Sequence, residues 1–243
     1  LPHQSVESFS NTLNKILTVK PDRFSIFNYA HLPTRFKPQR RINEADLPQP
    51  ATKLAILQHT INHLIEAGYV YIGMDHFALP DDELAIAQRN GTLYRNFQGY
   101  STHANCDLIG LGITSVGKVG NSYSQNVKTL EEYYTQVDAE HIPVFRGIAL
   151  NADDQLRRAV ITQLICHFTL DIAAIEKQYQ IDFKDYFATE WAELEMMQDD
   201  GLLVRGEQHL DILPAGHLLV RNICMTFDVY LRQSKEQKFS KVI

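Results

Sequence analysis

The chain has 243 residues, 44% of them hydrophobic, and its 23 Lys and Arg against 29 Asp and Glu give a net charge of −6. This length and composition allow one large folded domain, or one and a half smaller ones. The acidic balance argues against a general affinity for nucleic acid or acidic membrane surfaces, so an anionic ligand requires a local basic patch. The apolar runs are far shorter than the ~20 residues of a membrane-spanning helix, so we expect no membrane partner.

The three cysteines, Cys106, Cys166 and Cys224, are widely spaced and form no CxxC or CxxxC pattern. They therefore do not indicate a metal site. An odd number of separated thiols in an acidic chain is typical of a reducing cytoplasm, where such residues are mostly buried. We expect a cytoplasmic protein.

The first residues predict a helix that lies within a larger fold. Apolar residues recur with a helical period from Val6 to Leu17, and the preceding Leu-Pro is typical of a loop between a strand and a helix. The segment is neither basic nor followed by a small-residue cleavage site, so it is not a secretory signal. We interpret this start as the middle of a longer protein.

Extended and helical patterns then alternate. A strand is predicted from Phe24 to Tyr29, a helix over 51–67 that stops at Gly68, and a strand over 69–78. This order is typical of a parallel sheet or barrel. Short extended runs broken by glycine follow over 91–126, and they predict a small antiparallel extension.

The rest of the chain is largely helical, with helices over 129–140, 153–168 and 187–201, two short extended runs over 202–213 and a closing helix from Ala215 to about Arg232. The fold class is therefore α/β: the carboxy-terminal part of a (β/α) partial barrel with an antiparallel extension (1–126), followed by a mostly helical domain (127–243).

Helix, helix, two-stranded wing and helix from about 150 to 233 is the signature of a winged-helix-like module. Many such modules bind DNA, but fold does not imply function. The helix before the wing is acidic and would repel phosphates; its acids are Glu190, Glu193, Glu195, Asp199 and Asp200. We expect this module to cap an active site and to bind no nucleic acid.

Two close pairs of metal-ligating residue types are present. His59 and His63 are four residues apart, but the residues between them lack the glutamate of HExxH. His103 and Cys106 lack the two further ligands of a tetrahedral site. We interpret both pairs as unrelated to metal binding.

Phe97 and Gln98, in RNFQGY, form an aromatic and polar pair at the end of an extended run. Such a pair is more often structural than functional. An aromatic ring beside an amide is nevertheless what adenine recognition needs, because the ring stacks on the base and the amide bonds its edge. The glycine-rich run over 110–120 matches neither a dinucleotide nor a phosphate loop, and it indicates bulges or a close backbone approach.

The loop after the first predicted strand is basic, with Arg35, Lys37, Arg40 and Arg41. In a barrel this loop lies on the carboxy-terminal face, where active sites occur. Two interpretations stay open: a solvated charge cluster, or a clamp for carboxylates, which Arg can bind with two parallel hydrogen bonds.

Longer motifs carry a more specific signal. The chain closely resembles the oxygen-independent coproporphyrinogen III oxidase family of radical S-adenosylmethionine enzymes nearly from end to end, in FNYAHLPT (27–34), GMDHFALPDDELAIAQ (73–88), RNFQGYST (95–102) and RNICMTFDVYLRQ (221–233). The MDHFA and FQGY segments distinguish it from the related haem chaperones.

The resemblance implies an oxidoreductase of haem and porphyrin biosynthesis with a 4Fe-4S cluster and two S-adenosylmethionine molecules. Such an enzyme converts two propionates of coproporphyrinogen III to vinyl groups, gives protoporphyrinogen IX and carbon dioxide, and passes electrons to an acceptor. The implied protein is a cytoplasmic monomer. The family's CxxxCxxC cluster motif is absent from this chain, so we expect the carboxy-terminal part of the enzyme, inactive by itself and without metal ligands.

The resemblance also implies site residues. Ala30 matches a position beside the cluster-bound S-adenosylmethionine. Phe97 and Gln98 match positions at the second one, as does Val116, where the family typically has isoleucine. We assign Arg40 and Arg41 to the substrate propionates. Two alternatives stay open: a haem-binding or haem-delivery protein of the same superfamily, and a cluster-free structural or regulatory module.

Overall fold

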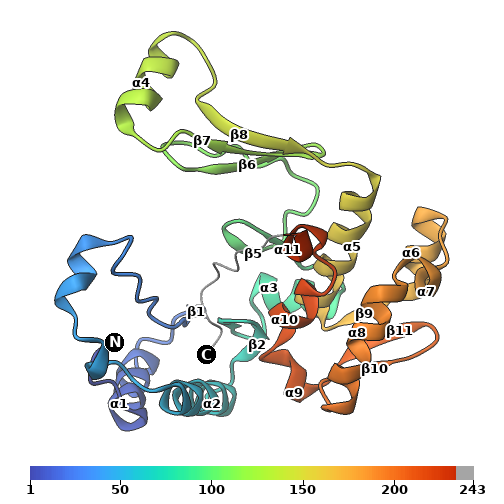
Figure 1. Ribbon diagram of the computed structural model, residues 1–243. Helices are drawn as coiled ribbons and strands as arrows, with labels where there is room; N and C mark the ends of the chain where they lie inside the picture. Colours follow the sequence, from blue (N-terminus) through green and yellow to red (C-terminus); the bar gives the residue numbers. More distant parts are fainter. Residues whose placement is uncertain (234–243) are drawn as a thin grey trace.

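The computed structural model describes residues 1–233. Three regions are visible in Figure 1: an amino-terminal region with α1 and α2, a sheet that projects away with α4 at its far end, and a helical carboxy-terminal region. None of the helices between residues 1 and 233 has the length and apolar character needed to cross a membrane.

The first two predicted helices are confirmed. Helix α1 (Val6–Leu17) begins at Ser5, whose hydroxyl accepts a hydrogen bond from the Ser8 amide in a capping box. Helix α2 (Pro50–Glu66) starts with a proline, and the chain turns away at Gly68, where φ is +91°. The two 3-10 helices η1 (Lys37–Arg41) and η2 (Glu44–Asp46) lie in the loop that leads from the first strand, residues 23–25, to α2.

A small antiparallel sheet packs beside these helices in the order β1-β3-β2. Its strands are β1 (Arg23–Ser25), β2 (Val70–Gly73) and β3 (His76–Ala78). The single strand predicted over 69–78 is wrong, because the chain reverses at Gly73 and Met74, whose φ angles are +143° and +52°. β1 and β2 each pair with β3 in the antiparallel direction. The two strands that α2 connects, β1 and β2, are therefore separated by β3 and do not pair directly as neighbouring parallel strands.

Helix α3 (Glu83–Arg89) leads into the hairpin of β4 (Tyr94–Asn96) and β5 (Gly99–Ser101). Tyr100 of this hairpin and Cys166 of the carboxy-terminal region lie in one buried cluster with Ile72 and Leu84. The hairpin is therefore packed onto both regions and held in a fixed position.

The antiparallel extension is confirmed, and it continues beyond residue 126. β6 (Val116–Val119), β7 (Ser122–Asn126) and β8 (Val144–Ala149) form a sheet in that order, with α4 (Leu130–Asp138) between the last two strands. Because β7 pairs with β8 across the expected domain division at residue 126, we propose to place the division near residue 150.

The carboxy-terminal region has the predicted order of helices and wing. It contains α5 (Ala152–His167), β9 (Thr169–Asp171), α6 (Ile172–Tyr179), α7 (Phe183–Tyr186), α8 (Ala188–Asp199), β10 (Leu203–Arg205), β11 (His209–Ile212), α9 (Pro214–His217), α10 (Val220–Met225) and α11 (Val229–Gln233). β9 pairs with β11 as a third strand of the wing sheet. A single closing helix over 215–232 is wrong: the segment is three short helices, and the Asp228 side chain accepts bonds from the first amides of α11.

The acidic surface predicted on α8 is smaller than expected. Glu190 is buried and bonds Arg157 at 2.8 Å. Glu193 pairs with Arg232 and Glu195 with Arg205. Much of the acidity of this helix is therefore neutralised within the fold.

Candidate functional site

The predicted aromatic and amide pair forms the tip of a tight hairpin. Because Asn96 pairs with Gly99 across β4 and β5, Phe97 and Gln98 are the whole two-residue loop. The side chain of Asn96 accepts a hydrogen bond of 2.8 Å from the Gln98 amide. Gly99 has a φ of +125°, and a Cβ there would lie 3.3 Å from Nε2 of His76. A glycine is therefore required, and the tip is held rigidly.

Both tip side chains are open to a ligand. The Phe97 ring is 53% exposed and meets the Tyr123 ring only edge-on, with centroids 5.2 Å apart. The Gln98 side chain is exposed, and its carboxamide group, unlike its backbone amide, forms no hydrogen bond to any of the residues the structure describes. A free ring and a free amide on one rigid turn fit the base or ribose of a nucleoside cofactor.

The fold brings Val116 toward this tip. Val116 begins β6 and pairs with Gln125, two positions from the pair of Lys118 and Tyr123. Since strand residues two apart share a face, Val116 lies on the same sheet face as Tyr123, which the Phe97 ring touches.

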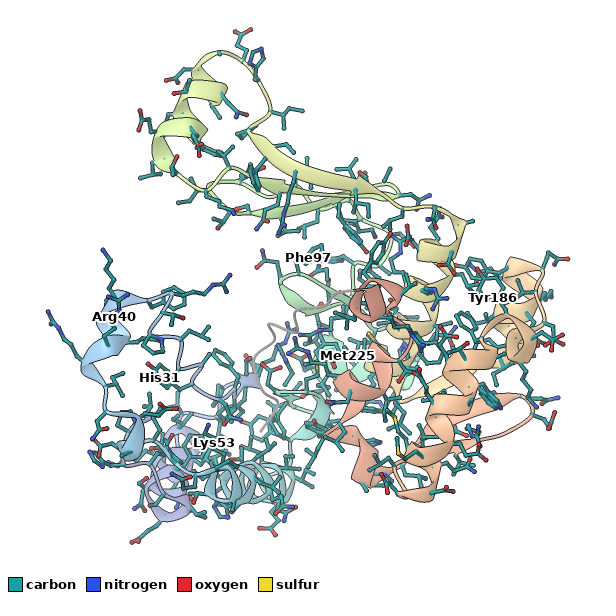
Figure 2. All side chains as sticks on the ribbon, viewed as in Figure 1. His31, Arg40, Lys53, Phe97, Tyr186 and Met225 are labelled. Carbon is teal, nitrogen blue, oxygen red and sulfur yellow. The ribbon has the colours of Figure 1, made fainter. Side chains whose placement is uncertain are left out.

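The remaining predicted residues belong to the amino-terminal region, as the labels of Arg40 and Phe97 show (Figure 2). Ala30 is exposed, and its carbonyl accepts a bond of 3.1 Å from the Gln39 side chain. Arg40 and Arg41 are exposed on η1, where Nε of Arg40 donates to the Pro33 carbonyl at 3.0 Å. The structure therefore groups Phe97, Gln98 and Val116, with Ala30 and the two arginines elsewhere.

A cavity of ≈ 340 Å³ lies beside Phe97, where the hairpin, the projecting sheet and the carboxy-terminal region meet. Its apolar lining includes Phe97, Tyr123 and Ile161, and its basic lining includes Arg95 and Arg158. The sequence interpretation did not single out these arginines. Arg95 is the first residue of the RNFQGY motif, and this place in the motif was the one signal that the sequence offered for it. Arg158 lies on a helix, where an arginine is ordinarily solvated.

Behind the cavity lies a buried polar group of the hairpin. The Tyr100 hydroxyl donates to the Ile165 carbonyl at 2.9 Å, and burial raises the pKa of this phenol. The guanidinium of Arg95 lies over the Tyr100 ring, 4.7 Å from its centroid. Tyr100 thus stays neutral and acts as a support for Arg95.

Asp75 is a carboxylate close to this group. Burial disfavours its ionised form, but hydrogen bonds from His76 and Ser25 and the charge of Arg95 outweigh burial and lower its pKa. Asp75 is therefore ionised at neutral pH.

The described residues do not fit an iron–sulfur cluster. Within residues 1–233, no group of three or more His, Cys, Asp or Glu side chains can hold a metal ion. Cys166 and Cys224 are buried, and burial raises the pKa of Cys166 to about 12. The His59 and His63 rings simply stack on each other, 5.5 Å apart.

Comparison with known proteins gives consistent matches. The family described as the HemN C-terminal domain matches residues 150–219. Oxygen-independent coproporphyrinogen III oxidase of Pseudomonas aeruginosa is 54% identical over the whole chain, which covers 53% of that relative. The protein of the same name from Thermostichus vulcanus is 49% identical, and the chain covers 75% of it.

A solved structure matches as closely. The structure reported as "Coproporphyrinogen III oxidase (HemN) from Escherichia coli is a Radical SAM enzyme" superposes with a TM-score of 0.92 at 52% identity, over 95% of this chain and 53% of that one. The chain therefore has the fold of the carboxy-terminal part of that enzyme, and it spans about half the length of most of the curated relatives it matches.

Proposed function

Because this chain belongs to the oxygen-independent coproporphyrinogen III oxidase family, we propose that the complete protein oxidatively decarboxylates two propionates of coproporphyrinogen III. The products are protoporphyrinogen IX and carbon dioxide. The observation that carries this proposal is the rigid tip of Phe97 and Gln98, which has an open ring and a free amide in a chain related to radical S-adenosylmethionine enzymes.

The residues of this chain serve to bind and orient. Phe97 stacks on one S-adenosylmethionine, Gln98 bonds its polar edge, and Val116 gives it an apolar contact from the sheet. Ala30, in the amino-terminal region, contacts the other S-adenosylmethionine, the one bound at the cluster, so the site at Phe97 holds the second molecule. S-adenosylmethionine, when bound with a 4Fe-4S cluster, supplies the radical chemistry; the ligands of that cluster do not come from residues 1–233.

Arg40 and Arg41 bind substrate propionates in this proposal. Both are exposed on η1, so their guanidinium groups are accessible. A charge-assisted hydrogen bond contributes about 1.5–3 kcal/mol. Replacing either arginine in the complete protein should therefore raise the KM for coproporphyrinogen III, and unchanged kinetics would leave them as a solvated cluster.

The partners and location follow from the same family assignment. We place the complete protein in the cytoplasm as a monomer that passes electrons to an acceptor. The widely spaced thiols support a reducing compartment, since Cys166 and Cys224 are buried and free. Size-exclusion chromatography with light scattering measures the molar mass of the complete protein in solution and so tests whether it is a monomer.

The decisive experiment is a Phe97→Ala/Gln98→Ala double variant of the complete protein. Cluster content and fold should be unchanged, because neither residue ligates iron, while bound S-adenosylmethionine should fall from two molecules to one and product formation by orders of magnitude. Phe145→Ala, which removes a ring of similar exposure on β8, is the control. Two bound cofactors and near-normal product in the double variant would refute the assignment.

A further inference from the structure

The cavity beside Phe97 has positive charge that no ion pair neutralises within the described chain. Arg95, Lys118 and Arg158 line it. Among residues 1–233, the Arg158 side chain makes one hydrogen bond, from Nη2 to the Asn121 side-chain oxygen at 3.2 Å. Lys118 lies over the Tyr94 ring and reaches the Ala104 carbonyl at 3.4 Å. None of these contacts supplies a negative charge.

The two carboxylates that line the cavity are already engaged. Asp154 accepts bonds from the Asn151 amide at 3.0 Å and from the Tyr230 hydroxyl at 2.9 Å. Asp228 accepts from the Tyr230 amide at 3.0 Å and from the Leu231 amide at 3.2 Å. Both therefore serve as helix caps.

The fourth cation of the lining has a different role. Arg157 bonds both carboxylate oxygens of Asp153 at 2.9 Å and one oxygen of Glu190 at 2.8 Å. Its charge is thus compensated inside the carboxy-terminal region. The other three cations of the cavity, Arg95, Lys118 and Arg158, have no ion pair within residues 1–233, although the charge of Arg95 also acts on the nearby Asp75 carboxylate.

Two of these cations have an unsatisfied donor. Nη1 of Arg95 and Nη1 of Arg158 are both buried without a hydrogen-bond partner in residues 1–233. An unmet buried donor is costly, and more so when it is charged. Two such donors on arginines of one cavity indicate that the site is completed by an anion. A carboxylate fits, because its two oxygens match the guanidinium fork.

The walls of the cavity restrict which carboxylate fits. Phe97, Tyr123, Ile161 and Ile165 give an apolar surface beside the arginines. S-adenosylmethionine has a carboxylate too, but its sulfonium and ammonium groups are repelled by the surrounding cations. A pyrrole with a propionate arm presents an apolar ring and a negative charge without a positive one.

Resting on the proposed function, we infer that Arg95 and Arg158 bind a propionate carboxylate of the tetrapyrrole in this cavity. The Phe97 ring then contacts two ligands: its exposed face contacts the cofactor at the hairpin tip, and the face toward the cavity contacts the substrate. The proposal adds a second carboxylate contact, on the carboxy-terminal side of the site, to that of Arg40 and Arg41.

The test measures binding of coproporphyrin III, the oxidised and fluorescent form of the substrate, to the complete protein without turnover. Arg95→Gln and Arg158→Gln should each weaken binding about tenfold or more. Arg89→Gln, which removes an exposed arginine at the end of α3, is the matched control and should leave affinity unchanged. Affinity equal to that of the unmodified protein in both cavity variants would overturn the inference.

Two further measurements separate charge from folding. Arg158→Gln should keep or raise the unfolding temperature, since the arginine it removes has an unmet donor; Arg158→Lys should restore part of the affinity. The tetramethyl ester of coproporphyrin III should bind the Gln variants and the unmodified protein alike. An equal loss of ester binding would mean that packing, not charge, was removed, and would overturn the inference.

The outcomes also distinguish this inference from the proposed function. Normal turnover of coproporphyrinogen III with unchanged KM in both Gln variants refutes the cavity site and leaves the function intact. If the unmodified protein neither turns over coproporphyrinogen III nor binds the porphyrin, both the inference and the proposed function are refuted. A loss of S-adenosylmethionine affinity with normal porphyrin affinity assigns the arginines to the cofactor and overturns the inference.

Discussion

The ring of Phe97 meets the ring of Tyr123 edge-on, with centroids 5.2 Å apart and planes at 86°. This contact links the tip of the β4–β5 hairpin to the middle strand of the projecting sheet. Aromatic pairs of this geometry contribute about 0.5–1.5 kcal/mol beyond the area they bury. The contact therefore orients a ring that is otherwise half exposed.

Removing that support should weaken the proposed cofactor site, although Tyr123 itself is not assigned to it. We expect Tyr123→Ala to raise the dissociation constant of the second S-adenosylmethionine by about 2- to 10-fold, the equivalent of losing the aromatic pair. Tyr123→Phe keeps the ring and should bind normally. Equilibrium dialysis of the complete protein measures both; an undiminished second site in Tyr123→Ala would show that Phe97 needs no support.

The carboxy-terminal region should depend strongly on Arg157. Its side chain is 14% exposed and pairs with Glu190, whose side chain is 7% exposed, and it also bonds the Phe227 carbonyl at 3.1 Å. Arg157→Met would leave that carboxylate buried near fewer cations, so we expect a loss of about 3–5 kcal/mol in the free energy of unfolding. Chemical denaturation of the complete protein tests this, with Arg89→Met as an exposed control. A loss no larger than in the control would contradict the structural role.

Acid should destabilise the protein through His217. Its ring stacks on Phe168 at 3.8 Å, and burial lowers its pKa below the ordinary value of 6.5. In the unfolded chain this histidine takes up a proton as pH falls through 6.5, before it does so in the fold. The unfolded state then binds more protons, so the stability from the neutral ring is present above that pH and is lost below it.

The check compares unfolding free energies across that pH range in the unmodified protein and in His217→Gln. The variant should show a smaller loss of stability on acidification. His167, whose pKa burial also lowers, stays in both proteins and gives the residual slope. Identical slopes in the two proteins would rule out a contribution from His217.

Prediction from sequence succeeded where the signal is local. Helix α1 has both its apolar period and its capping serine in the sequence, and it forms as expected. The β2–β3 hairpin was missed because its turn uses Met74 with a positive φ, in place of a dipeptide such as Asn-Gly. The closing helix was predicted as one because its apolar period continues across the breaks.

The candidate site shows the same difference between local and long-range sequence signals. Phe97 and Gln98 could be proposed from the sequence because they are adjacent in one motif, and the hairpin keeps them adjacent. Arg95 and Arg158 are far apart in sequence and meet at one cavity only because α5 packs against β4. No spacing rule covers such a pair, since the long-range packing that creates it is set by many buried residues together.

The winged module should not bind DNA, because its wing lacks free positive charge. Arg205 of β10 donates to the Trp191 carbonyl at 2.6 Å and lies 3.5 Å from Glu195, so it points into the fold. The turn of the wing contributes Glu207, which pairs with Lys184 at 2.9 Å. A protein that binds duplex DNA through phosphates needs several uncompensated Lys or Arg, and its affinity falls steeply with salt.

Fluorescence anisotropy with a labelled duplex at low ionic strength should therefore show no saturable binding by the complete protein. Tight binding with a steep salt dependence would contradict this, and would reassign the module from capping the active site to reading nucleic acid.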